Sequence, residues 1–207
     1  MITAADFGVS MIVAPAYIIS LKSGVLTFGQ SEYIVQGALF ILFCILMKKV
    51  KLVYFSSFAT GIIYGAVLDL WRTVIPPFNP EITPPGSMAL GIRITYLALG
   101  MVMTSFSIAL FFRTYFLPQV YDFFVKGISA HFNLDRNKFK IGFDIIFLLI
   151  SACVSLILFK GFKGIGTGTV VMTAFNGVLI GMFGKMFDKA IDFKPLFKNF
   201  SERFRLD

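Results

Sequence analysis

The sequence predicts an all-α polytopic membrane protein, and three observations lead to that prediction. Of the 207 residues, 57% are hydrophobic and only 14% are charged. The mean hydropathy of +0.83 leaves too little polar surface for a soluble domain of this length. The apolar residues also gather in runs of about 20, which is the length of helix that crosses a bilayer.

Five such runs predict five complete transmembrane helices, preceded by an N-terminal partial or re-entrant segment. The loop Thr73–Gly86 contains five prolines and is expected to be non-helical. It divides one integral membrane domain, 1–207, into a first repeat (1–72), a second repeat (87–186) and a basic amphipathic tail (187–207). The runs are Tyr33–Lys49, Leu52–Arg72, Met88–Phe112, Phe139–Phe159 and Gly166–Met186.

Lysine and arginine predict the orientation of the chain. Basic clusters follow the first run, the third run and the last run, so counting crossings places all three on one side. The positive-inside rule makes that side cytoplasmic, with the C-terminus there. Lys160 and Lys163, between the fourth and fifth runs, are an exception to the rule. The clusters are Lys48, Lys49 and Lys51; Arg113, Lys126, Arg136, Lys138 and Lys140; and Lys185, Lys189, Lys194, Lys198, Arg203 and Arg205.

Two segments have the pattern of amphipathic interfacial helices, Pro118–Phe132 and the tail from Phe193. In each, apolar residues rich in phenylalanine share one helical face, and lysines or arginines flank it. The tail could also dock a partner protein. Because the basic residues sit in short clusters beside apolar runs, we expect no binding of nucleic acid.

The two halves repeat a short pattern that predicts an inverted 3+3 repeat. A polar residue precedes Gly-xxx-Gly in both, at Thr60–Gly65 and at Asn176–Gly181. Met1–Ala5 resembles the end of a helix, so we expect a first spanning helix to be missing from this sequence. With that helix each half has three crossings, and an odd number inverts the second half. The alternative is that Gly-xxx-Gly recurs because it lets helices pack closely.

Polar residues at membrane depth are the candidate functional residues. Each has a structural alternative: a helix cap for Asp6, interfacial anchoring with Arg72 for Asp69, snorkelling for Arg93, and an ion pair or helix-end role for Asp144. The threonines and Asn176 could line a polar path or bond neighbouring helices. The candidate substrate path is Asp6, Thr60, Asp69, Arg93, Asp144, Thr167, Thr169 and Asn176.

The stretch Gly164–Thr169 reads Gly-Ile-Gly-Thr-Gly-Thr but matches neither a P-loop nor a dinucleotide fingerprint, which need other spacings beside a strand. We interpret it as a flexible entry to the last helix, whose free N–H groups could face a polar solute or serve only packing. No HExxH or GxSxG motif is present, and His131 is the single histidine. We therefore expect no enzyme activity, cofactor or metal, and expect Cys44 and Cys153 to be packing residues.

Short motifs in both halves together match one known family. They are Ala5-Asp6-Phe7-Gly8-Val9-Ser10, Ala14-Pro15-Ala16-Tyr17, Leu26-Thr27-Phe28-Gly29-Gln30, Gly65-xxx-Asp69, Leu117-Pro118 through Tyr121-Asp122, Lys140 with Phe143-Asp144, and Gly164–Thr169. In these the chain resembles the YczE/YyaS/YitT-like bacterial membrane proteins, the DUF6198 group. The resemblance implies a bacterial inner-membrane location and a further N-terminal helix before the Ala-Asp-x-Gly segment, with transport or export as the suspected activity.

Two functions remain open at this stage. The first is a small-solute transporter or permease with a polar site between the inverted halves. The second is a non-transporting scaffold or accessory, substrate-binding subunit that works with a partner, with the tail as its docking element. In either case we expect the lipid bilayer, a small-molecule substrate, and a homo-oligomer or partner subunit as the interacting species.

Overall fold

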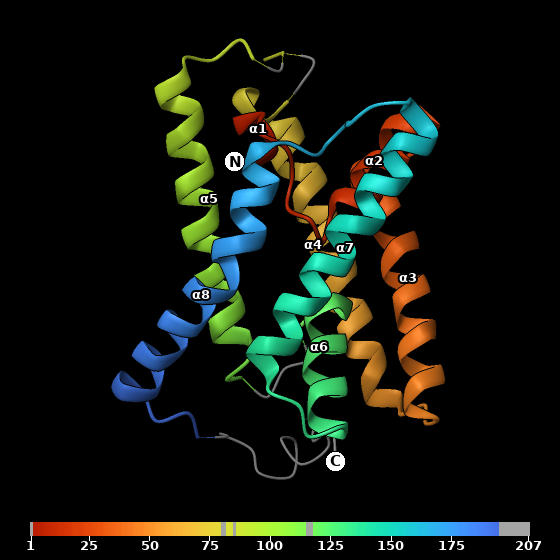
Figure 1. Ribbon diagram of the computed structural model, residues 1–207, viewed down its shortest axis with the longest axis vertical. Coiled ribbons are helices and arrows are strands. Elements are labelled where there is room, and N and C mark those ends of the chain that lie inside the picture. The colour runs from red at the N-terminus through yellow and green to blue at the C-terminus, as the bar shows by residue number, and fades with distance from the viewer. Residues whose placement is uncertain (1, 80–81, 85, 115–117, 195–207) are drawn as a thin grey trace.

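The computed structural model describes residues 2–79, 82–84, 86–114 and 118–194, and every regular element within those ranges is helical (Figure 1). Two of these elements are short 3-10 turns, Leu52–Tyr54 and Pro76–Phe78. The eight α-helices are α1 (Ile2–Ala5), α2 (Ala14–Ser23), α3 (Phe28–Met47), α4 (Phe55–Val74), α5 (Leu90–Phe111), α6 (Val120–His131), α7 (Arg136–Phe159) and α8 (Thr167–Ala190).

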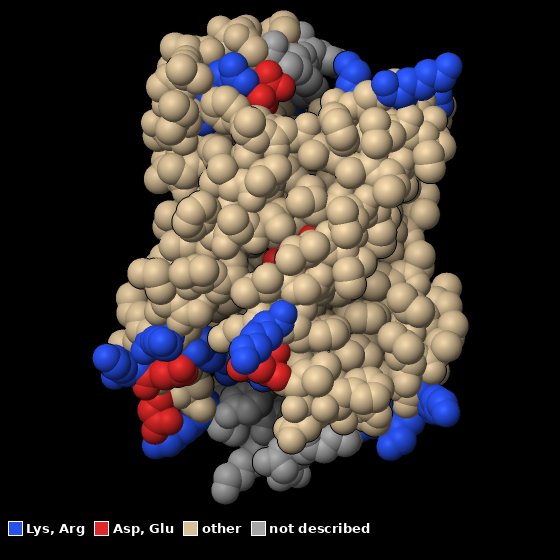
Figure 2. All heavy atoms as spheres, in the orientation of Figure 1, with Lys and Arg blue, Asp and Glu red and all other residues tan. Residues whose placement is uncertain are grey.

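Four of the described helices, α3, α5, α7 and α8, are long and apolar enough to cross a membrane. The helix α4 has the same length as α3, 20 residues, but Asp69 and Arg72 make it less apolar. On the face shown in Figure 2, Lys and Arg atoms lie near the two ends, and the band between them carries almost no charge. The apolar helices and this uncharged band indicate a multi-pass membrane protein.

The two short helices α2 and α6 pack at opposite ends of the same pair of long helices. Each contacts both α3 and α7, and Figure 1 shows α2 in the upper half and α6 in the lower half. Around this centre, α4 packs on α3, α8 packs on α7, and α5 packs on both α1 and α8. The two central helices, α3 and α7, therefore position α2, α4, α6 and α8.

Aromatic rings fill the contact between α6 and α3. The ring of Phe43 lies 4.4 Å from that of Phe123 and 5.3 Å from that of Tyr54, measured between centroids. A Cβ added at Gly127 of α6 would lie only 2.6 Å from the Phe43 ring, so a glycine is required for this approach. The predicted interfacial helix over Pro118–Phe132 is therefore wrong in its location: its apolar face is buried against protein, not against lipid headgroups.

Local side chains set where the helices begin. The Thr27 side chain accepts a hydrogen bond from the Gln30 backbone N–H, and the Gln30 side chain accepts one from Thr27 N–H. This capping box starts α3 at Phe28, five residues before the predicted start at Tyr33. In the same way, Asp135 accepts from Lys138 N–H and starts α7 at Arg136 instead of Phe139.

Three segments outside the long helices complete the fold. The N-terminal segment has a break, because no α-helix covers the residues between Ala5 and Ala14. The loop Thr73–Gly86 is not wholly non-helical, since α4 continues to Val74 and a 3-10 turn follows. In the tail, α8 continues to Ala190, while residues 195–207 lie outside the described residues.

The N-terminal break allows a substitution test of the fold. Gly8 has a φ of +92°, and a Cβ there would overlap the Gly166 backbone and the Thr169 side chain. Gly8→Ala should therefore lower the free energy of unfolding by about 2 kcal/mol, the cost of one strained backbone position. Gly142→Ala is the matched control because a Cβ at that helical position meets nothing within 4 Å.

The measurement is thermal unfolding of the purified protein in detergent. The expected result is a clear loss of melting temperature for Gly8→Ala and none for Gly142→Ala, since alanine in an open helical position is favourable. Equal melting temperatures for the two variants would show that the break does not have this backbone geometry.

Candidate functional site: a polar cavity between the two halves

A cavity of about 520 Å³ lies between the first and second halves of the chain. Its walls come from the N-terminal residues 2–13, from α4, from α5, from the start of α6 and from one residue each of α3 and α8. This volume falls within the range of small-molecule sites. Most of the lining is apolar, and polar groups reach it from both halves, among them Thr3, Ser10, Tyr64, Thr104, Ser107, Gln119, Tyr121, Asp122 and Asn176.

Asp122 connects the cavity to a buried ion cluster. The Nζ of Lys140 lies 3.2 Å from Asp122 Oδ1 and 2.9 Å from Asp144 Oδ1. The side chains of Lys140 and Asp144 are 2% and 1% exposed, so neither charge can be solvated by bulk water. An ammonium between two carboxylates is stable in such a place only because each charge is compensated by another. The cluster joins α6 to α7 directly behind the cavity wall.

A second buried polar cluster joins α6 to α3. The Oε2 of Glu32 accepts a hydrogen bond from the Tyr121 hydroxyl at 3.0 Å and one from Gln36 Nε2 at 3.1 Å. Glu32 is 0% exposed and Gln36 is 1% exposed. Tyr121 itself lines the cavity. Consecutive residues of α6, Tyr121 and Asp122, therefore link the cavity to one polar cluster on each central helix.

Asn176 is the predicted path residue that lines this cavity. Its Oδ1 accepts a hydrogen bond from the Ser105 hydroxyl at 2.5 Å, which ties α8 to α5 at membrane depth. Asp144 belongs to the ion cluster with Lys140, as its structural alternative proposed. Thr60 does not line this cavity. Its hydroxyl donates to the Ser56 carbonyl of its own helix at 3.0 Å.

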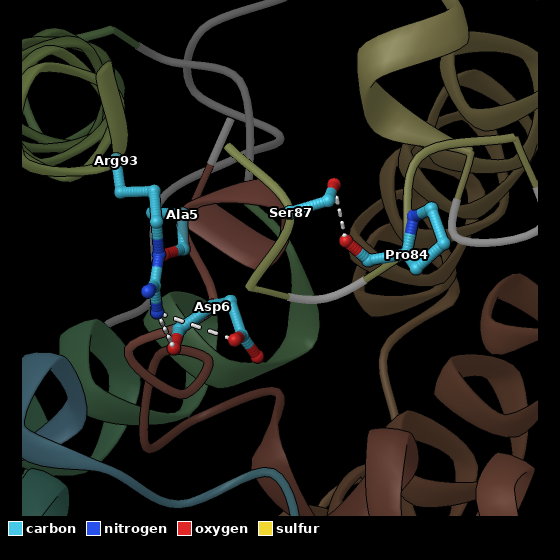
Figure 3. A network of polar contacts seen from close by, with 5 residues as sticks. All are labelled: Ala5, Asp6, Pro84, Ser87 and Arg93. Carbon is cyan, nitrogen blue, oxygen red and sulfur yellow. Dashed lines mark hydrogen bonds and ion pairs between the residues drawn. The ribbon is translucent and has the colours of Figure 1, made fainter. Parts of the chain in front are cut away.

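Arg93 and Asp6 hold the end of α1 against α5, as Figure 3 shows. The guanidinium donates to the carbonyls of Ala5 and Asp6 at 2.9 and 2.7 Å, and pairs with the Asp6 carboxylate at 3.2 Å. It also lies 4.5 Å from the centroid of the Phe7 ring. A cation on the last carbonyls of a helix is favourable. Arg93 therefore anchors α1 and does not snorkel freely toward headgroups. Figure 3 also shows the hydrogen bond that the Ser87 hydroxyl donates to the Pro84 carbonyl in the preceding loop.

Asp69 caps the beginning of α3. Its carboxylate accepts hydrogen bonds from the Thr27 hydroxyl at 2.7 Å and from the Gly29 backbone N–H at 3.2 Å. A carboxylate at a helix N-terminus is favoured by the unpaired N–H groups there. Asp69 thus joins α4 to α3 and does not line the cavity.

The Gly164–Thr169 stretch contacts the backbone of the N-terminal break. The Thr169 hydroxyl donates to the Val9 carbonyl at 2.7 Å, and Gly168 N–H donates to the Phe7 carbonyl at 2.8 Å. Gly166 approaches Phe7 so closely that no side chain fits. The Gly168 N–H in the first turn of α8 therefore has a protein partner, which favours the packing interpretation. Thr167 lies beside a second cavity of about 580 Å³, which Asp6 also lines.

The sequence does not predict Glu32, Gln36, Tyr64, Tyr121 or Asp122 as site residues, although Tyr121-Asp122 belongs to a family motif. Glu32 precedes the first predicted run, which begins at Tyr33. The Thr27-xx-Gln30 pattern is the signal that could find it, since a capping box starts the helix at Phe28 and places Glu32 one turn inside it. For Asp122 there is no such signal, because nothing in the sequence locates Lys140 beside it.

The comparison with known proteins agrees with the motif resemblance. A family model described as a family of unknown function, DUF6198, matches residues 1–185. The chain belongs to this family. No curated protein and no solved structure matches the chain. The match to DUF6198 includes both buried polar clusters and all residues that line the central cavity.

The ion cluster gives a second substitution test. Lys140→Met leaves Asp122 and Asp144 buried without their cation, so we expect a loss of stability of about 3–5 kcal/mol. Adding Asp122→Asn and Asp144→Asn to Lys140→Met removes the uncompensated charge and should restore much of the loss. Lys194→Met is the control, because Lys194 pairs with Asp192 in an exposed position, where such pairs contribute little.

Stability is measured by thermal unfolding in the same detergent for all variants. The account is contradicted if Lys140→Met melts like Lys194→Met, or if the triple variant is less stable than Lys140→Met.

Proposed function

We propose that this DUF6198 protein is a small-solute transporter of the bacterial inner membrane, with its solute site in the cavity between the two halves. The observation that carries the proposal is the cavity itself. Polar groups of α4, α5, α6 and α8 converge on it from both halves, and a buried ion cluster borders it. Polar and charged groups at membrane depth are costly and characteristically serve solute or ion movement.

The arrangement of helices supports an inverted repeat. In the second half the short helix α6 precedes two long ones, α7 and α8, and in the first half the short helix α2 likewise precedes the long helices α3 and α4. The short helices α2 and α6 each pack on both central helices, at opposite ends of the molecule (Figure 1). Inverted repeats of this kind place substrate sites at their interface near mid-membrane.

We propose α4 as a fifth crossing. Its 20 residues span about 30 Å at 1.5 Å per residue, the thickness of the hydrocarbon core. Its outward side chains Ile62, Ile63 and Leu70 are apolar and exposed. We place the end that carries the basic clusters, and with it the C-terminus, in the cytoplasm, because lysine and arginine favour that side.

The second cavity supports alternating access. Both cavities include Thr3 and Val9 of the N-terminal segment in their walls. The two spaces therefore meet at the segment Thr3–Val9. In the proposed mechanism this short connection, anchored by Arg93, opens and closes the route between them.

The transport test uses purified protein in proteoliposomes and a broad panel of radiolabelled small solutes. Wild-type protein should move at least one solute faster than empty vesicles. Ser107→Trp should abolish that flux because its indole fills the cavity. Val102→Trp is the matched control, since Val102 is an exposed residue of the same helix that does not line the cavity.

Flux at the empty-vesicle level for the whole panel would count against transport. Equal flux in Ser107→Trp and Val102→Trp would count against this cavity as the route. The accessory-subunit function remains the alternative prediction; a stoichiometric partner that is lost on deleting residues 193–207, in a protein that moves no solute, would favour it.

A further inference from the structure

Glu32 is an acidic side chain that pairs with no lysine or arginine among the described residues. Both of its donors, the Tyr121 hydroxyl and the Gln36 amide, are neutral. Among the described residues, Glu32 Oε1 and Gln36 Oε1 are buried and have no hydrogen-bond partner. An ionised carboxylate with only neutral partners at 0% exposure is expensive in hydrocarbon surroundings. The same carboxyl group carrying a proton is neutral and avoids most of this cost.

The second half of the chain shows how such a charge is otherwise compensated. Lys140 is the fifth residue after the cap of α7, Asp135, as Glu32 is the fifth residue after the cap of α3, Thr27. Asp144 follows Lys140 by four residues, as Gln36 follows Glu32. In α7 the Lys140 ammonium therefore lies beside the Asp144 carboxylate. In α3 the position of Lys140 is taken by Glu32 itself, and the residue that corresponds to Asp144 is the neutral Gln36. An exchangeable cation would supply the missing charge at Glu32.

A proton fits this site better than a metal ion. Among the described residues, no group of three or more histidine, cysteine or acidic side chains could hold a metal. A hard cation such as Ca²⁺ takes six to eight oxygen ligands. At Glu32 one carboxylate oxygen already accepts two hydrogen bonds, and the unpaired buried oxygens nearby are those of Ser31, Glu32 and Gln36.

We propose that Glu32 binds and releases a proton and thereby couples solute movement to the proton gradient. The coupling rests on the proposed transport function, whereas the proton site itself does not. Loading follows the hydrogen bond from Tyr121: its hydroxyl passes its proton to the Glu32 carboxylate and takes one from a hydronium ion in the cavity, which becomes water. The net change is one excess proton moved from the cavity to Glu32, with Tyr121 unchanged.

The groups around Glu32 suit this role on every side that packs against α3. Tyr121 on α6 donates to it, and Tyr64 on α4 lies within electrostatic range of it. The other charged or titratable groups of these three helices contact other residues. On α2, Tyr17 packs edge-on against Phe28 and Lys22 lies over Phe159; on α4, Asp69 binds Thr27 and Gly29 and Arg72 lies over Phe28. On α6, Asp122 pairs with Lys140, Lys126 donates to Thr114 and His131 packs against Phe132.

Infrared spectroscopy of the full chain in lipid nanodiscs tests the proton site without any solute. The chain contains only three glutamates, Glu32, Glu81 and Glu202. Labelling glutamate with ¹³C at the side-chain carboxyl therefore shifts the carbonyl bands of these three alone. At neutral pH we expect a band of a protonated carboxylic acid that moves on labelling, is lost in Glu32→Gln and remains in Asp188→Asn, the control on an exposed ion pair with Arg113.

Two further variants keep the test decisive. Glu32→Asp retains a carboxyl and should lose its sensitivity to the glutamate label while keeping an acid band. Tyr121→Phe should move the band to higher frequency, because the carbonyl loses a hydrogen bond. The proton site is overturned if wild-type protein has no label-sensitive acid band at neutral pH, or if that band persists unchanged in Glu32→Gln.

Vesicles separate this inference from the transport proposal. A label-sensitive acid band in a protein that moves no solute would overturn transport and coupling while leaving the proton site. For any solute that the wild type moves, Glu32→Gln should retain downhill flux and lose accumulation driven by a pH gradient. Undiminished gradient-driven accumulation in Glu32→Gln would overturn the coupling.

Discussion

The short helix α6 is held between the two central helices α3 and α7 by two buried polar contacts, and the rest of the arrangement depends on them. Tyr121 bonds to Glu32 on α3, and the next residue, Asp122, pairs with Lys140 on α7. Neither contact can be exchanged for water at that depth, so α6 has one position in which both are satisfied. That position leaves the cavity on one side of α6 and the aromatic cluster around Phe43 and Phe123 on the other.

Close backbone contacts fix the opposite end of the molecule. The N-terminal break and the Gly164–Thr169 stretch exchange hydrogen bonds between their main chains, and Gly8 and Gly166 leave no room for side chains between them. Arg93 adds a side-chain anchor for α1. Thr3 and Val9 of the segment thus held belong to the walls of both cavities. The proposed mechanism needs a movement of this segment that opens and closes the route between the two cavities.

The helices and their approximate ends could be predicted from the sequence because length and hydropathy alone determine what crosses a bilayer. The position of α6 could not, since an amphipathic helix with a phenylalanine face fits a lipid interface and a protein interior equally well. The same limit applies to the site. Asn176 and Asp144 were found because they interrupt apolar runs, whereas Tyr121 and Asp122 gain their meaning only from Glu32 and Lys140, which are distant in the sequence.

The central claim is that an aqueous cavity at membrane depth separates the two halves, and labelling of a single cysteine tests it most directly. In a chain with Cys44 and Cys153 replaced by alanine, Ser107→Cys should react with a small charged thiol reagent in vesicles. Val102→Cys should stay unreactive. Val102 does not line the cavity and lies on the outer surface of the same helix, where the hydrocarbon of the bilayer keeps a charged reagent away. A Ser107→Cys variant as unreactive as Val102→Cys would contradict the account.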